Sequence, residues 1–593
     1  MIKIISALSF VGFTFLSIGQ TYNSINPKTK HIIDSTYNSL LEKNKVIGTS
    51  IAIVHNNEIV YATGYGFQNQ SKNIKADENT VYRIGSCTKS FTALSVMQLQ
   101  EKEKLNINLP IQNYIPNLKM HSRFTDKNNI IIKNVLTHTS GLPGDLMNGF
   151  FCDNPPNIDW LISQMNYCTM TAPAGYQHSY SNIGYSLLGK LVENTSKLTY
   201  ENYLMNNVFK PLGMTSTFVN ATPENSVKLS KGYIDGKEID EVLIRDKAAG
   251  LIQSSAVDMG KYLKMYLNNG MGENGQVLTA KSIKEMEANA IANLILTKST
   301  EWGYGLYADS INVATETDTL FTRIIGHGGD TWAFHADFKF IPELNVGVVV
   351  LTNTDKGTKM VSASNLLKLY LKTENQTTIK YKKATYKNSS LTESLPKVSE
   401  LYGRYQLGSM DMIVDNPKKI KLNQKGLKII LKPKNDSLRY TAKVKLLGFI
   451  PFKIKHQEFK FVKYADEIYF KVITTKHGDE SYVSKKSEVK SISSTWKNTF
   501  GDYEVLGDNF ECKDCKFVNF EGVTLNISDN NDILTIKMKG KSKDTHTTVK
   551  FNEISDTLAV SLGIGRGAGE TLRILEDGHI FYNGFEFSKV KEK

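Results

Sequence analysis

Ser86 and Lys89 are the first pair of residues whose types and spacing suit catalysis. They lie in Gly85-Ser86-Cys87-Thr88-Lys89, which is followed by an apolar-rich segment typical of a buried helix. Residues three apart on a helix share one face, so the Lys89 amine can reach the Ser86 hydroxyl. A buried lysine can lose its proton and serve as the base for a serine nucleophile, and a helix N-terminus favours the developing alkoxide. Taken alone, the spacing favours a helix cap over a catalytic role for Ser86.

Tyr180-Ser181-Asn182 is the second candidate. A loop tyrosine beside a lysine can titrate low enough to shuttle a proton, and an asparagine can hold a substrate amide or carbonyl. The same spacing recurs at Tyr266 and Asn268 inside a helical pattern. The triplet by itself therefore leaves a structural role open.

His327-Gly328-Gly329 is the third candidate and precedes an apparent strand. Two glycines let a substrate approach the strand backbone closely, and an amide at a strand edge can donate to an oxyanion. Turn formation is the alternative for this triplet.

The elements that must position these residues alternate in type along the first 370 residues. Two β-rich runs at 51–54 and 59–62, joined by Asn56-Asn57, predict a hairpin, and a second strand pair is expected at 334–341 and 346–351. Helical patterns lie between them, at 90–103, 184–193 and 256–267. Strands at both ends with helices between predict an α+β domain built on an antiparallel sheet.

The three candidates occur in one order with further matching segments around them. At this point the chain resembles the serine β-lactamase and penicillin-recognising hydrolase family, which includes class C β-lactamases, D-alanyl-D-alanine carboxypeptidases, D-aminopeptidases and esterases. The resemblance covers about residues 32–371. It rests on Arg83–Lys89, Leu136–Leu142, Pro173–Gly189, Ala249–Ser255 with Asp258-Met259, Trp302–Leu306 and His327–Gly329.

Carried over to this chain, the resemblance implies that Ser86 is acylated and that Lys89 assists as base. Tyr180 would relay protons in acylation and deacylation, and Asn182 would orient the substrate. The backbone amides of Ser86 and Asp330 would form the oxyanion hole. The resemblance implies no cofactor and no metal.

One departure from the family pattern bears on specificity. Family members usually carry Lys-Thr-Gly where this chain has His327-Gly328-Gly329, so the cation that grips a substrate carboxylate is missing. An unperturbed histidine is mostly neutral at pH 7. This favours peptides or esters without a carboxylate at that place over β-lactams. Arg323, four residues earlier, is a candidate replacement for the cation, and His138 is interpreted as structural.

Beyond residue 372 the pattern changes to short strand-like runs, and Tyr402–Leu407 recurs as Phe500–Val505, 98 residues later. We expect two small antiparallel β-barrels, similar to those that follow the catalytic domain in D-aminopeptidases of the family. The expected organisation is a signal peptide (1–20), a catalytic domain (21–372), a linker (373–398) and barrel-like domains at 399–484 and 485–593.

The N-terminus and the overall composition suggest an exported globular protein. Met1-Ile2-Lys3 precedes an uncharged, apolar stretch to Ile18, which predicts a signal peptide, with a retained anchor as the alternative. With 40% hydrophobic and 22% charged residues, the chain is not of the disordered class. Of the net charge of +13, residues 401–500 contribute 21 − 9 = +12. Weak contact of this segment with anionic envelope material is therefore expected, with a solvated lysine-rich face as the alternative.

Five cysteines leave more than one possibility open in an exported chain. Cys152 and Cys168 flank a loop-like segment, and Cys512 and Cys515 form a lone CxxC. A local disulfide and free thiols are both compatible with this spacing, whereas one CxxC is a poor zinc site because a structural site takes four ligands. Cys87 is interpreted as a small buried hydrophobe.

The segment 563–568, Gly-Ile-Gly-Arg-Gly-Ala, fits a dinucleotide-binding fingerprint letter by letter. It leads into a strand-like run and leaves too little chain for the βαβ unit that gives the motif its meaning. We interpret it as a β-turn.

Together these features predict a serine hydrolase, periplasmic or secreted, that cleaves amide or ester bonds through an acyl-enzyme. A peptidase of D-amino-acid peptides or an esterase is favoured over a β-lactamase, with a small peptide or ester, for example one derived from the cell wall, as substrate. Neither nucleic acid nor, once the signal peptide is cleaved, a membrane span is expected. The alternative is a sensor or envelope-binding protein that is acylated without turnover.

Overall fold

The computed structural model describes most of residues 22–590. It leaves out 125–128, 223–226, 241, 293, 295–300, 315–317, 360–361, 382–393, 408–409, 425–426, 435–437, 447–449, 454–456, 465–466, 475–478, 488–490, 507–522, 531 and 541–545. The expected signal peptide, the CxxC pair and residues 382–393 of the expected linker lie outside the described residues. Within the described part, no helix is both long and apolar enough to cross a membrane.

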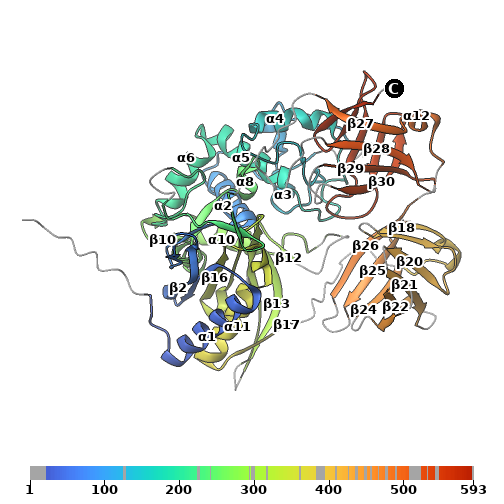
Figure 1. Ribbon diagram of the computed structural model, residues 1–593. Coiled ribbons are helices and arrows are strands. Elements are labelled where there is room, and N and C mark those ends of the chain that lie inside the picture. Colours follow the sequence, from blue (N-terminus) through green and yellow to red (C-terminus); the bar gives the residue numbers. More distant parts are fainter. Residues whose placement is uncertain are drawn as a thin grey trace, which may run out of the picture.

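A nine-stranded antiparallel sheet forms the centre of the first domain (Figure 1). Its strands run in the order β12 (Glu301–Trp302), β13 (Tyr307–Ala314), β14 (Thr319–Asp330), β15 (His335–Ile341), β16 (Val346–Thr352), β1 (Gly48–His55), β2 (Glu58–Asn69) and β3 (Ile74–Lys75), and β17 (Thr378–Tyr381) pairs with β13. Both predicted strand pairs are present, and Asn56 and Asn57 adopt the positive φ values that a tight hairpin turn needs. The predicted α+β architecture is confirmed.

The motif His327-Gly328-Gly329 precedes the expected strand, which is β15, and also belongs to a strand itself. The three residues lie at the end of β14, opposite Phe338, Asp337 and Ala336 of β15, so the alternative of a turn is not realised. Because the two glycines carry no side chain, other groups can approach the backbone of β14 closely at this point.

Helices cover both faces of the sheet, and β1 shows the alternation that this requires. Ala52 and Val54 face the core formed with α2 (Thr88–Glu101) and α9 (Ala256–Leu267). Ile51 and Ile53 face the opposite core, formed with α1 (Pro27–Asn44) and α11 (Ala363–Asn375). The helix α2 is buried along nearly its whole length, because α3 (Ile132–Leu136), α5 (Asn182–Ser196), α6 (Tyr200–Leu204) and α8 (Lys247–Gly250) also belong to the layer around it.

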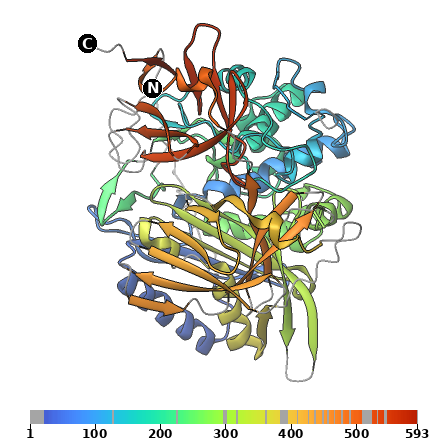
Figure 2. The ribbon, with the colours of Figure 1, turned by 90° about the vertical axis from the view of Figure 1, so that its right-hand side faces the viewer.

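The C-terminal third of the chain forms two closed, eight-stranded barrels (Figures 1 and 2). The first consists of β18 (Gly403–Leu407), β19 (Met410–Val414), β20 (Ile420–Gln424), β21 (Leu427–Pro433), β22 (Arg439–Leu446), β24 (Gln457–Tyr464), β25 (Glu467–Thr474) and β26 (Asp479–Ser487), with β23 (Ile450–Lys453) attached to β22. The second consists of β27 (Gly501–Leu506), β28 (Thr524–Asp529), β29 (Leu534–Lys539), β30 (Thr547–Ser555), β31 (Leu558–Ser561), β32 (Thr571–Ile574), β33 (Ile580–Tyr582) and β34 (Phe585–Lys589).

The repeated motif marks the first strand of each barrel. Gly403 and Gly501 both have positive φ values, of 145° and 137°. Tyr405 donates its hydroxyl to the carbonyl of Leu401, and Tyr503 donates in the same way to Thr499, each four residues earlier. The two motifs therefore serve the same purpose in both barrels, which is to tie the first strand to the turn that enters it.

Three of the five cysteines are described. Cys87, Cys152 and Cys168 are buried free thiols, so the possibility of a bridge between Cys152 and Cys168 is not realised in this structure. Cys87 is fully buried, as the sequence indicated, and its Sγ also donates to the carbonyl of His327, 3.3 Å away.

Candidate active site

Ser86 lies on a single turn between a short strand and the central helix. The strand β4 (Val81–Arg83) leads to Gly85, whose φ of +49° belongs to the left-handed region that favours glycine. The turn Gly85–Cys87 then runs directly into α2. The chain reversal at Gly85 places Ser86 at the N-terminal end of α2, where partial positive charge favours an alkoxide.

Lys89 is the most constrained polar side chain of the site. Its Nζ lies 3.1 Å from Ser86 Oγ, 2.7 Å from Asn182 Oδ1 and 2.7 Å from the carbonyl oxygen of Ala249. The side chain is fully buried. Burial, reinforced by the positive charge of Arg566, lowers the pKa of Lys89 to about 7, against the opposite effect of Asp145. The amine can therefore lose its proton near neutral pH while it touches the serine hydroxyl.

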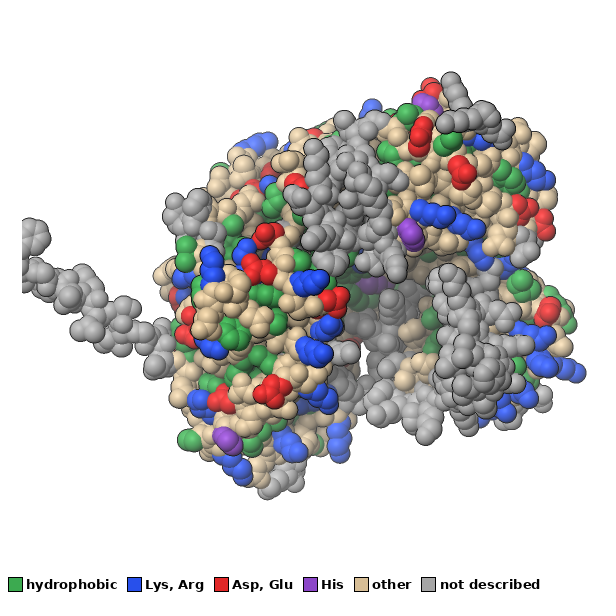
Figure 3. All heavy atoms as spheres, viewed as in Figure 1, with side chains coloured by type: hydrophobic (Ala, Val, Ile, Leu, Met, Phe, Trp, Pro, Cys, Tyr) green, Lys and Arg blue, Asp and Glu red, His purple; other side chains and the backbone are tan. Residues whose placement is uncertain are grey.

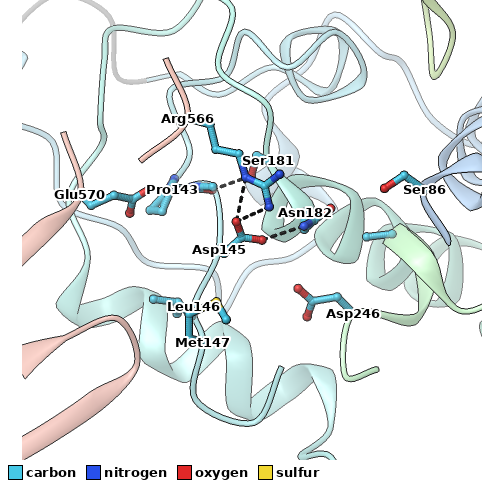
Figure 4. A network of polar contacts seen from close by, with 12 residues as sticks. Ser86, Pro143, Asp145, Leu146, Met147, Ser181, Asn182, Asp246, Arg566 and Glu570 are labelled. Atoms are coloured by element: carbon cyan, nitrogen blue, oxygen red, sulfur yellow. Dashed lines mark hydrogen bonds and ion pairs between the residues drawn. The ribbon is translucent and has the colours of Figure 1, made fainter. Parts of the chain in front are cut away.

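Asn182 begins α5 and connects Lys89 to a carboxylate that the sequence did not single out. Ser181 caps this helix by accepting from the Gly184 amide, 2.9 Å away. Asn182 Oδ1 accepts a hydrogen bond from Lys89 Nζ. Asn182 Nδ2 donates to Asp145 Oδ1, 2.7 Å away (Figure 4). Both ends of the amide are thus engaged, which fixes its orientation and the position of the lysine.

Tyr180 lies above this group, with its ring centroid 4.8 Å from Lys89 Nζ. The expectation that it titrates low was wrong. Burial raises the pKa of Tyr180, and this effect outweighs the hydrogen bond with Ser86 and the positive charge of Arg566, both of which lower it. The group is therefore a neutral phenol at ordinary pH, able to pass a proton on but not to hold a negative charge.

His327 is buried in the opposite wall and carries no charge. Its Nδ1 lies 2.6 Å from the carbonyl oxygen of Gly328, which can only accept, so the proton is on Nδ1. Burial and the positive charge of Lys89 lower the pKa of His327 to about 3. Nε2 is therefore a buried acceptor, and it has no hydrogen-bond partner among the described residues.

Arg323 does not replace the missing cation. Its guanidinium donates to the carbonyl of Glu287, 2.8 Å away, and lies 3.5 Å from a carboxylate oxygen of Glu301. These contacts hold it near the end of α10 (Ala280–Glu287). Besides Lys89, Arg566 lies near Tyr180, with its guanidinium carbon 5.3 Å from the ring centroid.

The two expected oxyanion donors lie next to each other because two glycines face one another. A Cβ on Gly85 would be 2.8 Å from the amide nitrogen of Asp330, and one on Gly329 would be 2.8 Å from the amide nitrogen of Ser86. Any larger residue at either position would push the serine turn and β14 apart. The backbone amides of Ser86 and Asp330 are thereby held within one small region, as an oxyanion hole requires.

An aromatic group supports Tyr180 from behind. The ring of His138 lies 4.2 Å from that of Tyr180, and its Nδ1 accepts from the Ser181 amide, 3.1 Å away. Trp302 packs edge-on against both His138 and His327. Burial holds the pKa of His138 well below its usual range, so this ring is a neutral support for the loop that carries Tyr180.

One group of side chains has the composition of a metal site, but it belongs to the second barrel. Asp577, His579 and Glu586 bring their ligand atoms together on the hairpin β33–β34 and the turn before it. His579 Nδ1 lies 2.8 Å from a carboxylate oxygen of each of the two acidic residues. The three groups therefore satisfy one another without an ion.

A cavity of about 640 Å³ lies where the three domains meet. Its wall includes Thr171–Pro173 and Tyr176-Gln177 of the first domain, Glu467–Tyr469 of the first barrel and the glycine-rich turn of the second barrel. Ser86 and Lys89 do not line it. The glycine-rich turn nevertheless connects the cavity with the candidate active site, because the same turn carries Arg566, which lies near Tyr180.

Comparisons with known proteins give a family for the first domain. Residues 33–371 match the family model described as Beta-lactamase. Protein flp of Staphylococcus aureus (strain N315) is 28% identical over 54% of this chain and 62% of its own length. The putative penicillin-binding protein PbpX of Bacillus subtilis (strain 168) is 30% identical over 44% of this chain and 61% of its own length. The chain therefore spans less than two thirds of the length of these curated relatives.

Solved structures resemble the chain more distantly. The octameric penicillin-binding protein homologue from Pyrococcus abyssi has 23% identity and a TM-score of 0.48, covering 77% of this chain and 100% of that one. The β-lactamase/D-alanine carboxypeptidase from Yersinia pestis has 21% identity and a TM-score of 0.49, covering 58% and 97%.

Proposed function

The chain belongs to the β-lactamase family, and from that premise we propose that it is a hydrolase that forms an acyl-enzyme on Ser86. The observation that carries the proposal is the contact between Ser86 Oγ and the buried Lys89 Nζ, 3.1 Å apart. A lysine with a pKa of about 7 supplies a base at neutral pH, which a serine hydroxyl needs before it can attack a carbonyl.

The contacts of the site support an assignment of roles. Neutral Lys89 removes the proton from Ser86 as Oγ attacks the substrate carbonyl, and the amides of Ser86 and Asp330 receive the oxyanion. The proton passes from Lys89 to Tyr180, whose neutral phenol protonates the leaving amine or alcohol. Asn182 holds Lys89 in place and binds the substrate backbone. Water then attacks the acyl-enzyme with the same groups acting in reverse order.

The uncharged His327 favours one class of substrate, because it stands where a cation would bind a substrate carboxylate. A neutral imidazole gives a carboxylate no charge-assisted contact. We therefore assign to this protein amide and ester substrates without a carboxylate near the scissile bond, such as peptides of D-amino acids, ahead of penicillins and free D-Ala-D-Ala termini. The proposal includes export to the periplasm or the medium, which rests on the apolar N-terminal stretch of the sequence alone.

Pre-steady-state kinetics with p-nitrophenyl acetate and D-alanine p-nitroanilide test this function. The hydrolase predicts a burst followed by steady turnover with at least one of the two. A single equivalent of released chromophore, with the acyl group retained on the protein, would instead identify a sensor that is acylated without turnover. No burst and no turnover with either substrate would contradict the proposal.

A further inference from the structure

The turn between β31 and β32 of the second barrel contains four glycines with positive φ values and is held by the side chain of Ser561. Gly563, Gly565, Gly567 and Gly569 all have positive φ values, between 75° and 118°. Ser561 holds the turn together, because its hydroxyl donates to the carbonyl of Gly567 and accepts from the amide of Glu570, each at 2.8 Å. The fingerprint dismissed as a dinucleotide motif is thus a turn, as predicted, but a rigid one with Arg566 at its tip.

This turn is fitted to the catalytic domain at several points. A Cβ on Gly569 would be 2.5 Å from the carbonyl oxygen of Thr171, so only glycine allows the approach. The amide of Thr169 donates to Thr571 Oγ1 at 2.8 Å, and the amide of Gly144 donates to Glu570 Oε1 at 2.9 Å. The position of the turn is therefore set by direct contacts of Gly569, Glu570 and Thr571, which follow Arg566 closely in the sequence.

Arg566 ends a series of polar contacts that leads through Asp145, Asn182 and Lys89 to Ser86, and Figure 4 shows the part between Arg566 and Asn182. Its guanidinium donates twice to Asp145 Oδ2, from Nε at 2.9 Å and from a terminal nitrogen at 2.5 Å. Asp145 Oδ1 accepts from Asn182 Nδ2, and Asn182 Oδ1 accepts from Lys89, both at 2.7 Å. Three contacts thus connect the second barrel to the base that activates Ser86.

We propose that Arg566 is a positioning residue of the active site, so that the second barrel completes the catalytic apparatus and does not merely follow it. This inference rests on the proposed acyl-enzyme function. Arg566 holds Asp145 in the orientation that fixes Asn182, and Asn182 in turn fixes Lys89 against Ser86. Its positive charge also lies over the ring of Tyr180 and opposes protonation of Lys89.

Positively and negatively charged groups both surround Lys89. The balance between them determines whether the pKa of Lys89 rises or falls when Arg566 is removed. Arg566 opposes protonation, whereas the carboxylates of Asp145 and Asp246 and the thiol of Cys87 favour it. The uncharged groups that face Lys89 are the rings of Tyr180 and Tyr185, together with His138 and His327, whose own protonation Lys89 suppresses. Removal of Arg566 takes away a positive charge near Lys89 and leaves Asp145 without its counter-ion. Both changes favour the protonated, inactive form of Lys89.

The test compares full-length Arg566→Ala with Arg573→Ala. Arg573 lies in the same interface, where it donates to the carbonyl of Tyr167 at 2.9 Å, and it therefore controls for weakened docking of the barrel. The readout is the acylation rate constant with p-nitrophenyl acetate between pH 5.5 and 9. For Arg566→Ala we expect a roughly ten- to hundredfold loss at pH 7 with little change in KM, and an acidic limb moved upward by about one pH unit.

Further variants separate positioning from folding. Arg566→Lys keeps the charge without the two-pronged geometry and should restore the position of the acidic limb but only part of the rate. Millimolar guanidinium ion should raise the rate of Arg566→Ala and leave that of Arg573→Ala unchanged. Thermal unfolding midpoints of all variants show whether each protein is folded.

The outcomes distinguish this inference from the function on which it rests. If wild type forms no acyl-enzyme, the proposed function fails first. If wild type is acylated but folded Arg566→Ala matches Arg573→Ala in rate and in pH profile, the barrel takes no part in catalysis and the inference is wrong. An equal loss of rate in both variants, with an unmoved acidic limb, identifies Arg566 as a docking residue only and also overturns it.

Discussion

Lys89 Nζ lies 3.1 Å from Ser86 Oγ, and this contact joins a fully buried amine to a hydroxyl at the start of the central helix. Burial lowers the pKa of the Lys89 amine. The carbonyl of Ala249 and the amide oxygen of Asn182 accept from the amine and keep it oriented toward Ser86. The base is therefore prepared before any substrate arrives.

The pH dependence of acylation should follow Lys89. Because the pKa of Lys89 is lowered to about 7, the amine is a protonated and inactive base below that pH and a free base above it. The acylation rate constant should fall about tenfold for each pH unit below 7 and level off above it. Stopped-flow burst rates with p-nitrophenyl acetate measure this. A flat profile between pH 5.5 and 8.5 would exclude Lys89 as the base, and Lys89→Arg, which stays charged, should be inactive throughout.

Tyr180→Phe should slow proton delivery to the leaving group. The phenol is neutral because burial raises its pKa, so it acts by passing a proton and not through a negative charge. We expect a loss of roughly a hundredfold in turnover, larger for an anilide than for an activated ester, whose leaving group needs less protonation. With the activated ester, whose acylation needs little help from Tyr180, intact-mass spectrometry should show the acyl-enzyme accumulating, because Tyr180 also acts in deacylation. Equal effects on both substrates would show that the hydroxyl only supports the fold of the loop.

The neutral His327 predicts discrimination against a carboxylate. We expect acetyl-D-Ala-D-Ala amide to have a higher kcat/KM than the same peptide with a free C-terminus, because the neutral His327 offers no charge to offset the desolvation of a carboxylate. His327→Lys should reverse the preference. Arg323→Ala is the matched control and should leave the ratio unchanged, since Arg323 is bonded to Glu287. A free carboxylate preferred more than tenfold by wild type would refute the assignment of specificity.

The lysine-rich barrel should bind anionic surfaces weakly. Lys418, Lys419, Lys421 and Lys432 are exposed, and blue Lys and Arg side chains are visible over this domain in Figure 3. Association with phosphatidylglycerol vesicles should fall between 50 and 500 mM salt, since exposed charges are screened over about 10 Å at 0.1 M. Lys418→Glu with Lys419→Glu should weaken it more than Lys537→Glu with Lys539→Glu on the other barrel. Binding that ignores salt would argue against this view.

The sequence predicted what is local and missed what is brought together by folding. Ser86 and Lys89 share one helical turn, and the strand pairs and the start of α5 carry their own turn and capping residues, so local patterns predicted these elements. The role expected of Ser86 and Lys89 came from the order of several motifs in the family resemblance. Asp145 and Arg566 are 421 positions apart, and nothing in either segment indicates the other. The pKa of Tyr180 was misjudged in sign, because a neighbouring cation is visible in a sequence whereas the extent of burial is not.

The most direct test of the account is the mass of the protein after reaction with a fluorophosphonate probe, in wild type and in Ser86→Ala. The substitution removes one hydroxyl from a turn whose shape depends on Gly85, so the fold should be unchanged and the thermal midpoint should confirm it. We predict one covalent adduct on wild type, located on Ser86 by peptide mapping, and none on Ser86→Ala, with hydrolysis reduced by several orders of magnitude. A folded Ser86→Ala protein that still carries the adduct, or still hydrolyses esters at the wild-type rate, would contradict the central claim.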